Sequence, residues 1–367
     1  MLKYIGSKRV LIDFILDVIN IISDSLINKN KNQIRVLDGF AGSCRVSYRL
    51  KQEGYYVIAG DYLNFVYHNI RTFVVADRKD YPPEIVNPII SNLNKINSKE
   101  CNDCWFRDLY SIQSKYFHPD NALKIDLIRR EIEKYQDELL KSILITSLLH
   151  AADKVDSTTG VQMAYLKNLA DRAYKPLILE YPDLLYGTGE AILGDITEWI
   201  TEVKDIDIAY FDPPYNSHSY LGNYHIWETL TLYDNPEVYG VAKKRIDVKK
   251  RKSKFNYKKD SYNTLSYIIN KVNAKHIVLS FNNEGFFTKE DLLKICKTRG
   301  YVIYVSKQHK RYIGSVIGIY NPQGNKVGKV SHTKNEEYLF IITSTKDDYK
   351  DLVNAMKSKN YNITQNT

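Results

Sequence analysis

The sequence of 367 residues contains only four cysteines and no apolar run long enough to cross a membrane. So few cysteines exclude the disulfide framework on which small secreted domains depend. Cys101 and Cys104 form the only Cys-x-x-Cys pair, and with His118 they would still leave a tetrahedral zinc site one ligand short. We therefore predict no metal site and interpret the cysteines as ordinary buried thiols.

A signal-peptide layout is also missing, because Asp13 and Asp17 interrupt the apolar stretch near the N-terminus. Hydrophobic residues make up 44% of the chain, which excludes a mostly disordered protein. The length suffices for one large domain with an insertion, or for two domains. These features predict a soluble, cytoplasmic protein.

Charge of one sign predominates, since the formal net charge is +9. A basic protein favours a polyanionic partner. Between Lys243 and Lys259 the chain reads KKRIDVKKRKSKFNYKK, in which Asp247 is the only acid. Taken alone, this run is better interpreted as a solvated loop. The alternative is a set of phosphate contacts, which would give salt-dependent affinity without sequence information.

The first part of the chain alternates helix and strand patterns. Apolar residues at helical spacing predict a helix over Lys8–Ser25. Short apolar runs that end in an acid predict strands over Ile34–Asp38 and Tyr56–Asp61, with a helix over Cys44–Glu53 between them. A strand, a glycine-rich loop, a helix and a second strand ending in an acid form the βαβ unit that binds nucleoside cofactors.

Residues 63–185 are mostly helical in pattern, with an amphipathic stretch over Ile125–Ala152. Strand patterns then return, over Ile206–Phe211, His276–Phe281, Tyr301–Val305 and Glu337–Ile342. We therefore predict an α/β sheet whose strands are separated by a helical insertion, with disorder only in the last few residues.

The tetrapeptide Asp212-Pro213-Pro214-Tyr215 follows a predicted strand directly. The prolines end the strand and make a rigid turn at the carboxyl edge of the sheet, where open α/β folds bind ligands. The Asp212 carboxylate and the Pro213 carbonyl could hold both hydrogens of an aromatic amine and free its lone pair for attack. Tyr215 offers a face for an extruded base. The alternative is a plain Pro-Pro turn that closes a strand.

A glycine-rich loop follows the first predicted strand, and its candidate cofactor contacts are Asp38, Phe40, Ala41, Gly42 and Ser43. Asp61, at the end of the second strand, is placed to accept from two ribose hydroxyls. A tight turn is the alternative for the loop.

Asp195 could accept from the amine of a cofactor's adenine, whose ring Tyr62 and Ile196 would sandwich. The local pattern supports a helix N-cap at Asp195 at least as well.

Taken in order, these motifs resemble those of the Dam-type adenine DNA methyltransferases, in the alpha-group order that places a target-recognition insertion before the catalytic tetrapeptide. The matching residues are Lys3–Lys8 (KYIGSK), Asp38–Ser43, Asp61, Asp195 and Asp212–Tyr215. Four more stretches resemble the branch that includes the FokI modification enzyme: Ala151–Lys167, Asn216–Thr229, Ser280–Gly285 and Lys310–Tyr312. The resemblance extends from Leu2 to about Ile342.

The resemblance implies a Rossmann-like class I methyltransferase sheet that uses S-adenosyl-L-methionine to methylate the exocyclic N6 amine of adenine in double-stranded DNA. The base is flipped and attacks directly, without a covalent enzyme intermediate or a metal. Tyr4 and Lys8 would contact the methionine end of the cofactor. A bacterial or phage origin, a restriction-modification or solitary role, and a cognate restriction endonuclease as a partner fit the same family.

The same resemblance, with the basic run, supplies candidate DNA contacts: Lys154, Lys167, Asn216, His218, Tyr220, Lys249, Lys250, Arg251, Lys252, Lys254, Lys310 and Arg311. A polar helix junction is the alternative for Asp153–Lys167, and a hairpin cap is the alternative for Lys310–Tyr312. The predicted domains are a discontinuous catalytic domain (1–62 and 186–345), a helical target-recognition insertion (63–185), a basic DNA-contacting segment (235–262) and a C-terminal tail (346–367).

Two other functions compete with this one. An enzyme of the same fold could methylate cytosine, an RNA adenine or the amide of a protein glutamine. An initial Asp212 favours adenine in DNA, since the cytosine enzymes more often begin the tetrapeptide with serine and the glutamine enzymes with asparagine. An inactive DNA-binding module is the other possibility, and the intact pair Asp212 and Tyr215 argues against it.

Overall fold

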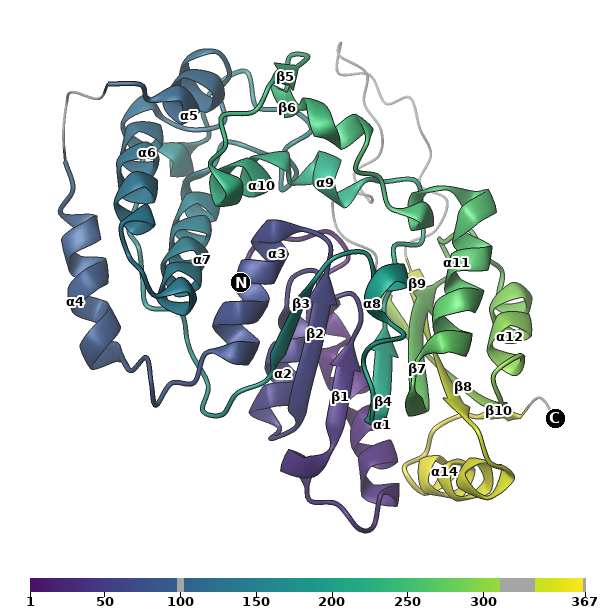
Figure 1. The fold of residues 1–367 in the computed structure, drawn as a ribbon. Coiled ribbons are helices and arrows are strands. Elements are labelled where there is room, and N and C mark those ends of the chain that lie inside the picture. Colours follow the sequence, from purple (N-terminus) through teal and green to yellow (C-terminus); the bar gives the residue numbers. More distant parts are fainter. Residues whose placement is uncertain (98–101, 311–333, 366–367) are drawn as a thin grey trace. The chain divides into compact units, whose positions relative to one another are not determined.

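The computed structural model describes residues 1–97, 102–310 and 334–365, and its chain forms two compact units. The first unit consists of Met1–Arg9, Lys31–Trp199 and His218–Ser253, and the second of Val10–Asn30, Ile200–Ser217 and Lys254–Thr367. Each unit combines strands with helices (Figure 1), which confirms the predicted α/β class.

Three parallel strands make up the sheet region of the first unit: β1 (Arg35–Asp38) pairs with β2 (Tyr56–Asp61), and β2 pairs with β3 (Glu190–Leu193). Helix α2 (Arg45–Gln52) connects β1 to β2, so the predicted βαβ unit is confirmed. The sequence patterns did not reveal β3. Its four residues are exposed or half-buried, and they lack the apolar signal of a core strand.

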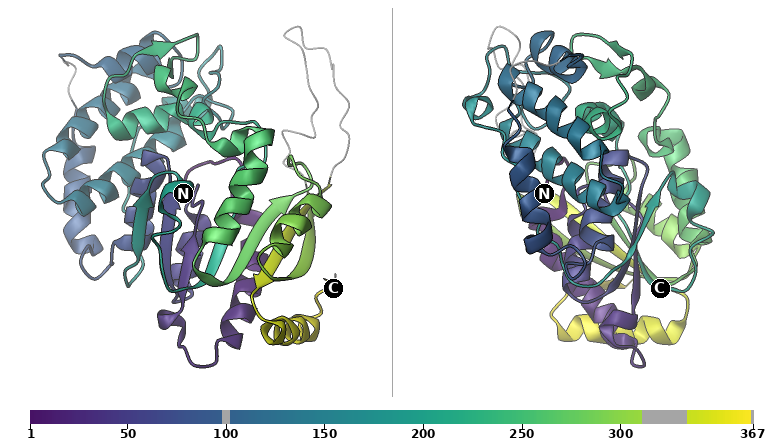
Figure 2. Two further views of the ribbon diagram at one scale, coloured as in Figure 1. Left: turned by 45° about the vertical axis from the view of Figure 1, so that its right-hand side comes forward. Right: turned by 60° about the vertical axis from the view of Figure 1, so that its left-hand side comes forward.

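The segment from residue 63 to residue 185 contains helices and no strand in the part that the structure describes. Its elements are α3 (Asn64–Ile70), η3 (Arg71–Val75), α4 (Pro83–Asn94), α5 (Trp105–Arg107), η4 (Asp108–Ile112), α6 (Pro119–Glu133), α7 (Glu138–Val155) and η5 (Asp171–Tyr174). The amphipathic stretch Ile125–Ala152 is therefore two helices and not one. Asp137 begins α7, because its carboxylate accepts from the backbone N–H groups of Leu139 and Leu140. Figure 2 shows these helices in blue, with α6 and α7 packed on each other.

The first unit is completed by short elements: α8 (Ile196–Trp199), α9 (Tyr220–Asn223), α10 (His225–Leu232), β5 (Val238–Tyr239), β6 (Lys244–Arg245) and η6 (Ile246–Lys249). Strands β5 and β6 pair with each other in an antiparallel hairpin.

The sheet region of the second unit has the strand order β10-β8-β9-β7-β4. Strand β4 (Ile206–Phe211) is parallel to β7 (Ala274–Asn282), whereas β7, β9 (Lys334–Thr343), β8 (Tyr301–Lys310) and β10 (Thr364–Gln365) pair antiparallel. All four predicted strands of this region are confirmed, three of them longer than predicted. Helices α11 (Lys258–Lys271) and α12 (Lys289–Lys297) follow η7 (Lys254–Asn256) and β7, respectively.

The predicted helix over Lys8–Ser25 divides into a 3-10 turn, η1 (Lys8–Val10), and α1 (Ile12–Ser25). The segment described from sequence only as a C-terminal tail forms α14 (Lys346–Ser358) and β10. Helix α14 packs against α1 (Figure 1), and the Tyr361 hydroxyl donates to the Asp17 carboxylate. None of the described helices combines the length and apolar character needed to span a bilayer.

Candidate active site and DNA-contacting segments

The tetrapeptide Asp212–Tyr215 begins where β4 ends. All six residues of β4 are buried, and Pro213 is buried as well, so the turn is anchored in the core of the second unit. The C-terminal end of the turn is hydrogen-bonded to the loop after β7, because the Phe286 N–H donates to the Tyr215 carbonyl oxygen at 2.9 Å. The Tyr215 ring lies edge-on to Phe281, with 5.2 Å between ring centroids. The aromatic ring of the tetrapeptide is therefore fixed by packing.

Gly285 explains why the loop after β7 fits against this turn. A Cβ atom at position 285 would lie 2.9 Å from the Tyr215 Cβ and closer still to the Phe281 ring. A side chain at this position would have to displace one of these two rings. The stretch Ser280–Gly285, which the sequence showed only as a family resemblance, is thus the support of the tetrapeptide.

The glycine-rich loop after β1 is closed by hydrogen bonds to its neighbours. The Ser47 hydroxyl donates to the buried Asp38 carboxylate at 2.5 Å, and the Ala41 N–H donates to the Gly60 carbonyl at 3.1 Å. Gly42 has a φ of +49°, in the left-handed region that glycine adopts most easily. Burial raises the pKa of Asp38 to about 6. Of the loop's other candidate residues, Ala41 and Ser43 are buried and Phe40 is half-buried.

The structure brings Asp61, predicted from the end of the second strand, into direct contact with this loop. One of its carboxylate oxygens accepts from the Gly42 N–H at 3.1 Å and the other from the Leu63 N–H at 3.0 Å. Burial raises the pKa of Asp61 to about 7, against the lowering effect of these two hydrogen bonds. The nearby carboxylates of Asp38 and Glu228 raise it further.

Tyr4 lies in a stack of three aromatic rings. Its ring is parallel to Tyr220 within 8° at 5.1 Å, and to Tyr224 within 10° at 4.8 Å. The backbone N–H of Ile5 donates to the Tyr224 hydroxyl at 2.6 Å. A Cβ at Gly42 would lie 3.1 Å from the Tyr4 ring, so the ring packs directly on the glycine-rich loop. Tyr224 belongs to the stretch Asn216–Thr229 that resembles the family, and no local pattern marks it as a stacking partner.

Two buried acids from the end of α7 hold the N-terminal segment that carries Tyr4. The Lys3 N–H donates to the Asp153 carboxylate at 3.1 Å, and the Lys3 ammonium pairs with Asp156 at 3.1 Å. Arg172 pairs with Asp156 as well, at 2.9 Å. Asp153–Lys167 therefore includes a polar junction, which is the alternative weighed from the sequence. Within it, Lys154 pairs with Glu180 at 2.5 Å.

Asp195 caps α8. Its Oδ1 atom accepts from the Thr197 N–H at 2.9 Å and from the Thr197 hydroxyl at 2.8 Å. This is the N-cap that the sequence pattern allowed. The same carboxylate has a second oxygen, so capping and cofactor binding are compatible. The two residues predicted to flank the cofactor's adenine, Tyr62 and Ile196, are half-buried and buried, respectively. Lys8 is 5% exposed.

The basic run is folded rather than a featureless loop. It contributes strand β6, the turns η6 and η7, and the start of α11. Its two central arginines, Arg245 and Arg251, are paired with acids, whereas Lys249, Lys250, Lys252 and Lys254 are exposed. The Lys249 ammonium lies over the Tyr239 ring, 4.2 Å from its centroid.

The remaining DNA-contact candidates lie in several places. Lys167 and His218 are exposed, Asn216 and Tyr220 are half-buried, and the Asn256 side chain donates to the Asn216 carbonyl at 3.2 Å. Lys310 is the last residue of β8, and Arg311 lies outside the described residues.

The cysteines are buried where they are described, and burial raises the thiol pKa values of Cys44 and Cys296. Cys104 is buried but disulfide-bonded, so the prediction of a free thiol is wrong at this position. Cys101 lies outside the described residues. Among the residues that the structure places, no group of three or more metal-ligating side chains is gathered.

The strands, helices and motifs are consistent with the α/β fold of class I methyltransferases, as predicted. A family model described as D12 class N6 adenine-specific DNA methyltransferase matches residues 4–292, and the chain belongs to this family. This confirms the resemblance drawn from the sequence motifs.

Curated relatives support the same assignment. The chain is 30% identical to Modification methylase StsI of Streptococcus sanguinis over 309 residues, which are 81% of this chain and 46% of that protein. It is 30% identical to Type II methyltransferase M.FokI of Planomicrobium okeanokoites over 324 residues, 82% of this chain and 47% of that protein. It thus spans about half the length of these two. Type II methyltransferase M.NlaIII of Neisseria lactamica is 29% identical over 355 residues, 94% of this chain and 100% of that protein.

Proposed function

We propose that this protein transfers a methyl group from S-adenosyl-L-methionine to the N6 amine of adenine in double-stranded DNA. The observation that carries the proposal is the turn Asp212–Tyr215, which follows a fully buried strand and is packed against the loop after β7. An acid, a proline carbonyl and a fixed aromatic ring in one rigid turn suit an aromatic amine as the substrate. Family membership supports adenine as the base.

The first unit contains residues that fit the methyl donor. Asp61 is a half-buried acid whose charged form is disfavoured by desolvation, and hydroxyl donors from a ribose would stabilise that charge. The glycine-rich loop lies against Asp61 on one side and Tyr4 on the other. The methyl donor can approach the backbone of this loop only because position 42 has no side chain.

In this assignment Asp61 holds the ribose, and Asp195 accepts from the adenine amine between Tyr62 and Ile196. Tyr4, Lys8 and the loop residues Asp38, Phe40, Ala41, Gly42 and Ser43 surround the methionine end.

The bound donor supplies a methyl group on a positively charged sulfur, which leaves as a neutral thioether. The protein's own part is to prepare the nucleophile. Asp212 and the Pro213 carbonyl accept hydrogen bonds from the two N6 hydrogens, which draws the nitrogen toward tetrahedral geometry and exposes its lone pair. After transfer the methylated nitrogen loses one proton, for which the Asp212 carboxylate is the acceptor at hand. Pro214 keeps the turn rigid, and Tyr215 stacks on the flipped base. No metal and no covalent link to the enzyme are needed.

We assign DNA binding to the helical insertion (63–185) and the basic segment (235–262), and catalysis to 1–62 with 186–345, followed by the tail (346–367). Exposed lysines of the basic segment would contact phosphates and make the affinity salt-dependent. The names of the relatives, which are modification methylases and type II methyltransferases, favour a restriction-modification role beside a cognate endonuclease.

The test is a methyl-transfer assay with labelled S-adenosyl-L-methionine and mixed-sequence duplex DNA, followed by hydrolysis to nucleosides. Label in N6-methyl-2′-deoxyadenosine is the expected result. Parallel assays offer RNA or a glutamine-containing protein in place of the DNA. Label in methylated deoxycytidine, in the RNA or in the protein would replace the proposal with the corresponding acceptor. DNA binding without any transfer to these acceptors would identify an inactive binding module.

A further inference from the structure

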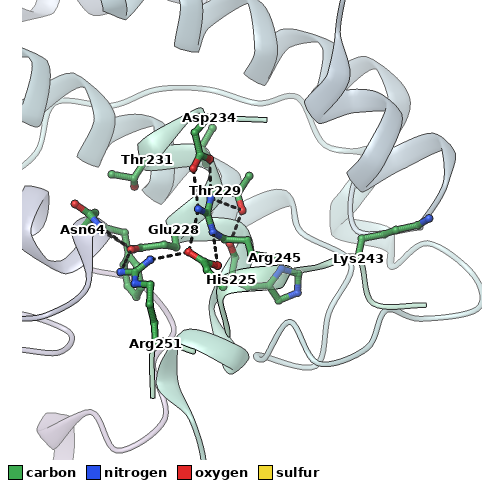
Figure 3. Close-up of polar contacts among 12 residues, drawn as sticks. Asn64, His225, Glu228, Thr229, Thr231, Asp234, Lys243, Arg245 and Arg251 are labelled. Atoms are coloured by element: carbon green, nitrogen blue, oxygen red, sulfur yellow. Dashed lines mark hydrogen bonds and ion pairs between the residues drawn. The ribbon is translucent and has the colours of Figure 1, made fainter. Parts of the chain in front are cut away.

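The two arginines of the basic run form a continuous network with three acids (Figure 3). Arg245, 4% exposed, donates to Asp234 at 2.7 and 2.8 Å and to Asp247 at 3.1 and 3.2 Å. Arg251 donates to Asp247 at 3.2 Å and to Glu228 at 2.6 Å. Asp247, the one acid of the run, therefore bridges both guanidinium groups.

Glu228 connects this network to another part of the first unit. It lies on α10, its side chain is fully buried, and one oxygen accepts from the Asn64 amide at 2.8 Å as well as from Arg251. The other oxygen accepts from the Phe65 N–H at 3.3 Å. Asn64 and Phe65 are the first two residues of α3, so Glu228 is hydrogen-bonded to the start of that helix; Figure 3 shows its contact with Asn64.

The start of α3 adjoins the proposed ribose acceptor. Leu63, the residue before Asn64, donates its N–H to the Asp61 carboxylate at 3.0 Å. Burial is the main cause of the raised pKa of Asp61, and the carboxylate of Glu228 adds to it, so the two acids lie close enough to interact. A paired cation offsets the cost of burying a charged carboxylate, and Arg251 is the cation bonded to Glu228.

We infer that Arg251 is a positioning residue of the cofactor site, acting through Glu228 and the first turn of α3 on Asp61, and is not a phosphate contact. The inference rests on the proposed function, because it takes Asp61 as the ribose acceptor. Arg251 presents separate nitrogen atoms of a planar fork to Glu228 and to Asp247, whereas a lysine would have to reach both acids from a single compact ammonium.

The experiment compares two matched substitutions, Arg251→Lys and Arg245→Lys, in the full chain. Both retain the charge and both disturb a pair with Asp247, but only Arg251 bonds Glu228. Isothermal titration calorimetry with S-adenosyl-L-methionine should show a Kd about 10-fold higher for Arg251→Lys, as expected when one charge-assisted hydrogen bond is removed. Arg245→Lys should bind within about twofold of the unmodified chain.

Melting temperatures of both variants without cofactor separate positioning from general loosening. If Arg245→Lys does not fold, Asp234→Asn replaces it as the control, because the Asp234 side chain is 42% exposed. If Arg251→Lys binds S-adenosyl-L-methionine as tightly as the unmodified chain, the inference is overturned and the proposed function is not. An equal loss of affinity in Arg251→Lys and Arg245→Lys would also overturn only the inference. A chain that binds no S-adenosyl-L-methionine at all would overturn the proposed function together with this inference.

A double-mutant cycle tests the route through Glu228. Glu228→Gln should weaken cofactor binding, and adding Arg251→Lys to it should weaken binding little further, because both changes break one connection. Additive effects would show that Arg251 acts by another path, which would overturn the assignment.

Discussion

The turn after β4 and the basic run between Lys243 and Lys259 show two ways in which a chain fixes the positions of polar and charged groups. The turn is specified by neighbouring residues: a buried strand ends, and two prolines fix the path of the next residues. The basic run is uniform in composition, yet its arginines are paired inward and its lysines are exposed. The number of basic residues in a segment therefore does not reveal which of their side chains are exposed and available to a ligand.

Acids outside and inside the run determine which of its cations are paired and which are exposed. Glu228 lies in the first turn of α10 and Asp234 lies just after the helix ends, and each binds one arginine of the run. Because these pairs draw the guanidinium groups onto the first unit, exposed lysines remain as the candidates for phosphate contacts. Five predictions test the contrast between the two regions and the role of Asp61, the acid at the end of β2.

The largest effect is expected at the tetrapeptide. Asp212→Ala removes one of the two acceptors for the N6 hydrogens and should lower kcat by about 10³-fold or more. Affinity for S-adenosyl-L-methionine should stay within about twofold, since Asp212 is not assigned to the donor. Single-turnover methylation and calorimetry measure the two quantities. Normal turnover in this variant would remove Asp212 from the catalytic assignment.

Asp61 should make cofactor binding depend on pH. Its pKa in the folded protein is about 7, and ribose hydroxyls favour the ionised form, so affinity should fall about 10-fold per pH unit below 7. Asp61→Asn should weaken binding at pH 8 by about 10- to 100-fold and abolish this dependence. Calorimetry between pH 6 and pH 8.5 checks both, and a pH-independent affinity of the unmodified chain would contradict the assignment.

The same shift has a consequence for stability, with the opposite sign from a salt-bridged acid. A raised pKa means that the folded state binds the proton more tightly, so this stabilisation is present at low pH and is lost as pH rises through about 7. Without cofactor, the melting temperature should fall between pH 5 and pH 8, and less so in Asp61→Asn.

A smaller effect is expected at the support of the tetrapeptide. Gly285→Ala places a Cβ against Tyr215 and Phe281, and such overpacking costs about 1–3 kcal/mol. We expect kcat to fall about 10-fold through displacement of the Tyr215 ring. Gly222→Ala is the control, because its Cβ would meet nothing closer than 3.5 Å. Equal activity of the two variants would show that the contact does not position the turn.

The smallest effect per residue is expected in the basic run. Replacing Lys249, Lys250, Lys252 and Lys254 by alanine should reduce the slope of log affinity against log salt by about 0.9 for each phosphate that is no longer neutralised. Fluorescence anisotropy with duplex DNA at several salt concentrations measures the slope. Replacing Lys346, Lys350, Lys357 and Lys359 removes the same charge elsewhere and should leave it unchanged. Identical slopes in both variants would show that the run is a solvated surface and does not contact phosphates.

The sequence alone determined the elements whose signal is local. Strands β1 and β2 are apolar runs that end in an acid, β4 is one that Asp212 follows directly, and the structure has all three where the pattern predicts. Burial of consecutive residues requires apolar side chains, and proline and glycine mark chain reversals by their φ angles, so such signals are written in neighbouring residues. The contact between Asp61 and the glycine-rich loop also follows, because parallel strands β1 and β2 end at one edge.

Only the tertiary structure decided the pairings between distant segments. The half-buried strand β3, the aromatic stack of Tyr4 with Tyr220 and Tyr224, and the bonds from Arg251 to Glu228 have no local pattern. Each joins residues far apart in the chain, and a hydrogen bond or a ring contact depends on where the backbone carries both partners. The composition determines how many tyrosines, arginines and acids the chain contains, and the fold determines which of them are in contact.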